Sequence, residues 1–192
     1  MNIAKLKKFI TGKLERELSG KLTYHGVQHT LYVLKVCNQY ITRMQIPAED
    51  AYLLRTAALM HDTGYLHGHE NHEERSMAYA SKILPDWNYT NRQIEKINGM
   101  IRATKVPQKP DNLLERIIGD ADLDYLGTGS FYTIGDRLYR EFKNYDLIHD
   151  RKEWDRLQVD FLQKHRYHTQ YAKKHREPVK QKHLQELLGV LH

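Results

Sequence analysis

The hydrophobic positions of this sequence recur with the spacing of α-helices along most of its length. In one stretch Val33, Val36 and Tyr40 lie 4, 7 and 11 residues after His29, which places all four on one helical face. No alternating run predicts a β-strand, and no Asn-Gly or Asp-Gly pair joins two apolar runs. The pattern therefore predicts an all-α fold, a compact helical bundle. The predicted helices span residues 2–19, 27–44, 48–62, 72–84, 91–104, 112–126, 131–144, 152–165 and a basic final segment ending near residue 191.

The breaks between these helices predict a single domain. Pro47 suits the first position of the helix predicted over residues 48–62, and Gly64 lies just past its end. The segment PQKP at residues 107–110 is the clearest interruption, but the piece on either side is small for an independent core. We therefore interpret it as a loop and expect one domain over residues 1–192.

The single cysteine and the N-terminal sequence indicate the cellular compartment in which we expect the protein. The single cysteine, Cys37, lies among apolar residues, which is typical of a buried thiol in a reducing compartment. Four lysines interrupt residues 1–20, so this stretch lacks the continuous apolar core of a signal peptide or a membrane span. We expect a cytoplasmic protein that does not enter a membrane.

The charge balance favours anionic partners. The 30 Lys and Arg residues against 24 Asp and Glu give a formal net charge of +6, which suits phosphorylated small molecules and nucleic acids alike. The segment 167–183 mixes basic and aromatic residues, but we interpret it as a basic outer helix and do not expect nucleic acid as the partner. The histidines scattered through the charged C-terminal part of the chain are predicted to be solvated: His149, His165, His168, His175 and His183.

Three predicted helices each direct a potential metal ligand towards the core. His61 continues the apolar face of Leu54 and Ala58, and Asp62 follows it directly. His29 begins the apolar stripe described above, and Asp122 lies four residues after Ile118.

Burying such carboxylates without a partner costs several kcal/mol, which a shared cation would offset. The mixed nitrogen and oxygen set suits Mn, Fe, Co, Ni, Mg or an open Zn site better than a closed structural zinc site.

The order of these residues resembles the H…HD…D signature of the HD-domain superfamily of metal-dependent phosphohydrolases. The similar phrases are YHGVQHT, LMHDTGY, NHEERS and GDADLDYLG, which occur in the order of the family within residues 24–127. The resemblance implies an HD-type helical bundle, with residues 131–192 as a C-terminal helical extension. It also implies hydrolysis of a phosphate ester, often in a nucleotide, at a divalent metal ion. The implied metal ligands are His29, His61, Asp62 and Asp122.

Further roles follow from the same resemblance. In the family, the last aspartate of the motif, a metal ligand, follows an alanine. This resemblance selects Asp122, with Asp120 and Asp124 as alternatives. His25 resembles the first histidine of a YHNxxH phrase that protonates the leaving group in related phosphodiesterases, although this sequence has Gly26 where they have asparagine. Metal-activated water is the implied nucleophile, and Asp62 as a ligand would orient it.

Residues after the HD doublet supply additional candidates. His72, in NHEERS, resembles a ligand of a second metal in two-metal members, and the adjacent Glu73 could orient a ligand or activate water. Arg102 and Lys105 could bind a phosphate group or stabilise charge in the transition state. We therefore expect catalytic or substrate-binding roles for His25, Glu73, Arg102 and Lys105.

Other functions remain open at this point. The domain could be a nucleotide-binding regulatory module with little turnover, or a di-iron oxidative member of the same superfamily. A third alternative uses the basic C-terminal helices to bind nucleic acid. The sequence leaves open the choice of substrate, of monoester or diester, of metal, and of oligomeric state.

Overall fold

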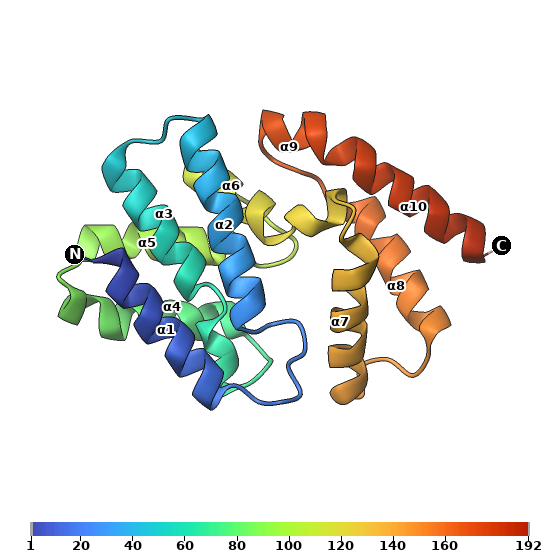
Figure 1. Cartoon of the computed structure of the whole chain (residues 1–192), viewed down its shortest axis with the longest axis horizontal. Coiled ribbons are helices and arrows are strands. Elements are labelled where there is room, and N and C mark those ends of the chain that lie inside the picture. Colours follow the sequence, from blue (N-terminus) through green and yellow to red (C-terminus); the bar gives the residue numbers. More distant parts are fainter. Residues whose placement is uncertain (1, 192) are drawn as a thin grey trace. The chain divides into compact units, whose positions relative to one another are not determined.

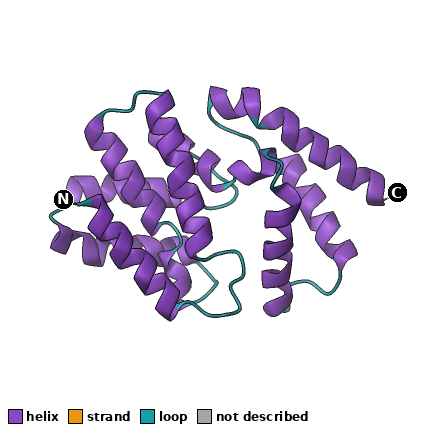
Figure 2. Cartoon of the chain, viewed as in Figure 1, coloured by secondary structure: helices purple, strands orange, loops and turns teal. Residues whose placement is uncertain are grey.

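The computed structural model describes residues 2–191, and this part of the chain contains helices and loops but no β-strand (Figure 2). The predicted all-α class is therefore confirmed. The structure divides into two compact units. Unit 1 comprises the chain up to Ser19 together with His25–Asp122, and unit 2 comprises Gly20–Tyr24 together with the chain from Leu123 onward. The expectation of a single domain over residues 1–192 stays a prediction.

Unit 1 contains six α-helices and two short 3₁₀ helices (Figure 1). They are α1 (Ile3–Glu17), α2 (Val27–Arg43), α3 (Ala48–Met60), η1 (Thr63–His67), α4 (His72–Ile83), η2 (Leu84–Trp87), α5 (Asn91–Arg102) and α6 (Leu113–Asp122). Helix α3 packs against α1, α2, α5 and α6, and α2 also packs against α6. The central position of α3 explains why most of its residues from Leu53 to Met60 are buried.

Two predicted helices of unit 1 end earlier than their apolar pattern suggests. Helix α3 ends at Met60, and the chain then turns into η1 after Asp62, whose φ and ψ are −105° and 6°. Helix α6 ends at Asp122, and Leu123 leaves the helical conformation. Both breaks occur at candidate ligands, so their side chains lie at helix ends rather than on a helical face.

Unit 2 contains η3 (Asp124–Gly127), α7 (Phe131–Asn144), α8 (Arg151–Lys164), α9 (Gln170–His175) and α10 (Glu177–Leu191). The short segment Gly20–Tyr24 is bonded to α7: the Tyr24 backbone N–H donates to the Glu141 carboxylate at 2.8 Å, and the Thr23 hydroxyl donates to the Arg137 carbonyl at 2.7 Å. Helix α10 packs against α8, α9 and η3.

The interior of unit 2 holds polar groups that the sequence pattern did not predict. Lys180 is fully buried, and its ammonium donates to the His165 carbonyl at 2.6 Å and lies 2.9 Å from a Glu177 oxygen. The prediction that His165 and His183 are solvated is wrong, because both are buried, while His149 and His175 are exposed as expected. His183 contacts the Leu126 carbonyl through Nδ1 at 3.0 Å.

Within residues 2–191, no helix is both long enough and apolar enough to cross a membrane.

Candidate metal centre

Four donor side chains from three helices meet inside unit 1. His29 lies in the first turn of α2, His61 and Asp62 follow directly on the last residue of α3, and Asp122 is the last residue of α6. The side chains of His61, Asp62 and His29 are almost completely buried, and that of Asp122 is 14% exposed. Among the residues that the structure describes, His29, His61 and Asp122 form one group whose donor atoms lie mutually within 4.8 Å.

The distances between the donor atoms are those of ligands around one ion. The Nε2 atom of His29 lies 3.0 Å from Asp122 Oδ1, 3.2 Å from His61 Nε2 and 3.4 Å from Asp62 Oδ2. His61 Nε2 lies 3.2 Å from Asp62 Oδ2 and 3.6 Å from Asp122 Oδ1. Metal–ligand bonds of about 2.0–2.2 Å at octahedral to tetrahedral angles separate neighbouring donors by roughly 2.8–3.6 Å. All five distances fit that range.

The hydrogen bonding of His61 and Asp62 is also consistent with a bound cation. His61 Nδ1 lies 2.9 Å from the Ala58 carbonyl, so this nitrogen carries the proton and, in the neutral ring, Nε2 presents its lone pair to the cluster. Asp62 Oδ2 is buried and makes no hydrogen bond, although two imidazole nitrogens lie close to it. A buried carboxylate oxygen without a donor needs compensation, which a shared cation would supply.

Electrostatics in the cluster favour positive charge. Burial opposes ionisation of His61, but the carboxylates of Asp62 and Asp122 outweigh it and raise the pKa of His61 well above its ordinary value. Burial also opposes the charge on Asp62, but His61 and His29 prevail and hold the pKa of Asp62 far below its usual range. The C-terminal ends of α3 and α6, which carry partial negative charge, add to the same field.

His72 and Glu73 border the four donors. His72 Nε2 lies 3.7 Å from Asp62 Oδ1 and 3.5 Å from Glu73 Oε1. Asp62 therefore directs one carboxylate oxygen to His29 and His61 and the other to His72. Burial lowers the pKa of His72 despite the nearby carboxylates of Asp62 and Glu73, so its ring is neutral at physiological pH.

His25 lies close to both His29 and His72. Its ring is half-buried just before α2, with its centroid 5.9 Å from that of His29 and 6.0 Å from that of His72. The structure thus places His25, His72 and Glu73 next to the cluster, and their roles stay predictions.

Residues 26–124, which contain all four donors, match the family model of the HD domain. The chain belongs to the HD domain family. The matched region covers more than half of the chain, and the match supports membership of a superfamily of metal-dependent phosphohydrolases. The His, His and Asp cluster of this HD domain could hold a divalent metal ion.

A solved structure has a similar fold. It is a predicted HD superfamily hydrolase from an uncultured Thermotogales bacterium, with a TM-score of 0.57 and 20% sequence identity. The similarity covers 85% of the present chain and 96% of that chain. A search of curated proteins found no match.

The remaining aspartates of the HD motif region lie elsewhere. Asp120 is fully buried in α6 but is not part of the donor group. Asp124 belongs to unit 2, where it accepts a hydrogen bond from Arg176 Nε at 2.7 Å. The structure therefore brings Asp122 to the two imidazoles rather than either alternative.

Arg102 and Lys105, the two basic residues predicted to bind phosphate, lie on the surface of unit 1. Lys105 forms an ion pair with Glu74 in the first turn of α4, next to Glu73, and that hydrogen bond raises the pKa of Lys105. Arg102 is exposed at the last residue of α5.

The sequence pattern did not single out Tyr65, which the structure places among the histidines. Its only signal in the sequence was its position between the doublet His61-Asp62 and the following His67 and His69.

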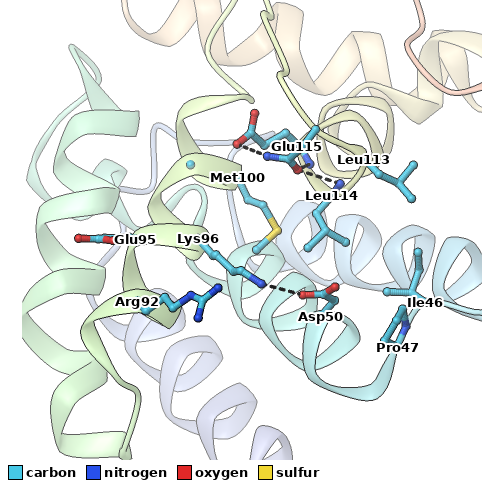
Figure 3. A pocket seen from close by; sticks show the side chains of 12 residues that line it. Ile46, Pro47, Asp50, Arg92, Glu95, Lys96, Met100, Leu113, Leu114 and Glu115 are labelled. Atoms are coloured by element: carbon cyan, nitrogen blue, oxygen red, sulfur yellow. Dashed lines mark hydrogen bonds and ion pairs between the residues drawn. The ribbon is translucent and has the colours of Figure 1, made fainter.

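A separate pocket of about 690 Å³ lies at the other ends of α3 and α6 (Figure 3). Its lining includes Asp50, Lys96, Met100 and Glu115, and Figure 3 shows the Lys96–Asp50 ion pair at 3.2 Å. Since each helical residue advances about 1.5 Å, the first turn of α3 lies well over 10 Å from His61. The pocket is therefore distinct from the donor cluster.

Proposed function

We propose that this protein is a divalent-metal-dependent phosphohydrolase that cleaves a phosphate ester of a nucleotide or a similar small molecule. The observation that carries the proposal is the meeting of four donor atoms, from three helices, at the separations of ligands around one ion. Membership of the HD family supports the reaction class. The net charge of +6 is consistent with an anionic substrate.

In this proposal His29, His61, Asp62 and Asp122 hold the cation. When bound, the cation would activate a water molecule and polarise a phosphoryl oxygen. The Ala58 carbonyl fixes the His61 ring through the 2.9 Å contact at Nδ1, so the orientation of one ligand is set before a metal binds. Asp62 orients the attacking water through the carboxylate that it places in the cluster.

His25 is the proposed general acid. Its half-buried ring lies at the border of the cluster, where a leaving-group oxygen of a bound ester would be within reach. Protonating that oxygen as the bond to phosphorus breaks prevents the build-up of negative charge on the alcohol product. Glu73 is proposed to accept a proton from the attacking water or to hold His72, whose Nε2 lies 3.5 Å away.

Arg102 and Lys105 are the proposed contacts for the substrate phosphate. Lys105 pairs with Glu74 beside the first turn of α4, so binding of a phosphate by Lys105 requires this surface ion pair to open. An exposed pair of this kind contributes little free energy because solvent screens it. The pair is therefore a weak obstacle to a doubly charged phosphate.

One observation favours a second form of the proposal with two cations. Asp62 directs its two carboxylate oxygens to different imidazoles, Oδ2 to His61 and Oδ1 to His72. Asp62 in that position would have one carboxylate oxygen available for each of two cations. In this form His72 binds the second cation, and the number of metal ions per chain separates it from the one-metal form.

The test is release of phosphate, nucleoside or nucleotide product from a panel of mono-, di-, tri- and cyclic nucleotides. Each assay is run with Mn²⁺, Mg²⁺, Co²⁺, Ni²⁺ or Zn²⁺, using the wild-type chain, Asp62→Asn and Asp50→Asn. Asp50 is the matched control, because it lies in the first turn of the same helix and pairs with Lys96 at the surface. We expect turnover by the wild type and Asp50→Asn, and its loss in Asp62→Asn.

Other outcomes separate the alternatives. Tight nucleotide binding without turnover would replace the hydrolase with a regulatory module. Two bound iron ions per chain with oxygen-dependent chemistry would indicate the oxidative alternative. Equal turnover by Asp62→Asn and the wild type would refute the proposed site.

A further inference from the structure

Tyr65 is surrounded by histidines at the border of the candidate metal centre. Its ring stacks with His25 at a centroid distance of 4.3 Å and an interplanar angle of 19°, and with His72 at 4.2 Å and 24°. His69 meets the same ring edge-on at 5.6 Å. One aromatic ring therefore contacts three imidazoles that come from three different segments of unit 1.

The backbone around Tyr65 is tightly held. The Gly64 N–H donates to the Ser76 hydroxyl at 2.8 Å, and a Cβ added at Gly64 would lie only 1.9 Å from the His72 carbonyl oxygen. The helix η1 is thus pressed against the start of α4. With only 5% of Tyr65 exposed, its ring occupies a fixed position in the interior of the unit.

The two stacked histidines lie at helix starts that lack side-chain caps. His25 precedes Gly26, the capping residue of α2, and His72 is the first residue of α4 after Asn71, which has a φ of 50°. Neither capping residue closes its helix with a side-chain hydrogen bond. With no side-chain cap at either start, packing against a fixed neighbour is what restricts the orientations of these imidazoles.

We propose that Tyr65 is a positioning residue, whose buried ring holds the imidazoles of His25 and His72 in place beside the donor cluster. Proton transfer depends on a correctly oriented group, and misplacement by about 1 Å can reduce a rate about 100-fold. The kinetic consequence rests on the proposed function, in which His25 is the general acid. The geometric part of the inference does not depend on that function.

The test compares Tyr65→Met, Tyr65→Phe and Tyr89→Met in the full chain. Methionine fills the buried volume without stacking, and phenylalanine retains the stacked ring. Tyr89 is the matched control, because it is equally buried in unit 1 but stacks on Tyr52 instead. Thermal unfolding establishes that each variant is folded, and bound Zn²⁺ per chain establishes that the four donors are intact.

The first measurement is the NMR spectrum of the histidine ring protons in the Zn²⁺-loaded protein. We expect the His25 and His72 signals to lose the ring-current shift of Tyr65 in Tyr65→Met and to keep it in the Phe variant. The second is hydrolysis, where Tyr65→Met should lower kcat by about tenfold or more and change KM by less than about threefold. Tyr65→Phe and Tyr89→Met should stay close to the wild type in both measurements.

Unchanged His25 and His72 signals in Tyr65→Met would overturn the inference. So would a loss of kcat no larger than that of Tyr89→Met. If the wild-type chain hydrolyses no substrate, the proposed function fails, and the NMR comparison alone decides whether Tyr65 positions the histidines. If Tyr65→Met does not fold, the shifts in Tyr65→Leu take its place in the comparison.

Discussion

Asp62→Asn should abolish most of the stabilisation that a metal ion gives to unit 1. Asp62 is 5% exposed, and its Oδ2 atom lies 3.2 Å and 3.4 Å from the nitrogens of His61 and His29. Asparagine retains the size of the side chain but removes the negative charge. Breaking a buried charged interaction costs about 3–5 kcal/mol, which corresponds to roughly 10²–10⁴-fold weaker metal binding.

This loss converts into a measurable change in melting temperature. A metal ion at 100 times its Kd stabilises the folded protein by about 2.7 kcal/mol, whereas the same concentration stabilises a variant with 100-fold weaker binding by about 0.4 kcal/mol. For a chain of this length, 1 kcal/mol shifts Tm by roughly 2–4 °C. The wild type should therefore gain about 5–11 °C, and Asp62→Asn less than about 2 °C.

The assay is differential scanning calorimetry with Mn²⁺ or Zn²⁺ and with a chelator. Comparing each protein with and without metal removes the effect of the substitution on the metal-free fold. Asp50→Asn, on the same helix, should show the full wild-type shift. The reasoning is refuted if Asp62→Asn gains as much from the metal as the wild type does.

Three further predictions concern packing, pH and thiol reactivity. Gly64→Ala should destabilise unit 1 by about 3 kcal/mol in urea unfolding, since the new Cβ would lie 1.9 Å from the His72 carbonyl oxygen. Burial and the neighbouring Lys180 lower the pKa of His165 to about 3. Below the unfolded value of 6.5 the unfolded chain therefore binds a proton that the folded chain does not, and stability should fall by about 2.3 kcal/mol between pH 6.5 and 4.5. Burial raises the pKa of the Cys37 thiol, so this residue should react with a chromogenic disulfide only after denaturation.

Matched variants make these outcomes decisive. Gly189→Ala should leave stability nearly unchanged or increase it, because a Cβ there meets no atom within 4 Å; equal effects of the two glycine substitutions would contradict the packing argument. The pH-dependent loss should be smaller in His165→Gln, and identical acid unfolding curves would exclude His165 as its cause. Rapid reaction of Cys37 in the native chain would show that its environment opens.

The ligand positions could be predicted because burial and polarity conflict in the sequence. His29 and His61 continue apolar helical faces, and such faces accept a polar side chain only when it has a partner in the interior. The structure indeed brings these rings and the Asp122 carboxylate within 3.6 Å of one another. Their role as metal ligands stays a proposal.

Other features could not be predicted because no local pattern specifies them. The apolar periodicity continues through Asp62 and Asp122, so it does not show that α3 and α6 end there. The burial of Lys180 depends on acceptors that include the backbone carbonyl of His165, fifteen residues away. Likewise, the place of Tyr65 between His25 and His72 depends on its contact with His25, which lies forty residues earlier in the chain.

The bonds between Gly20–Tyr24 and α7 have a consequence for the order of folding during synthesis. The Tyr24 N–H donates to a carboxylate of Glu141, which lies 117 residues later in the chain. At about 5–20 residues per second, the ribosome needs roughly 6–23 s to add those residues. Unit 2 is therefore completed only after all of unit 1 has been made. Gly20–Tyr24 has to wait for α7, while the helices on both sides of this segment can already pack.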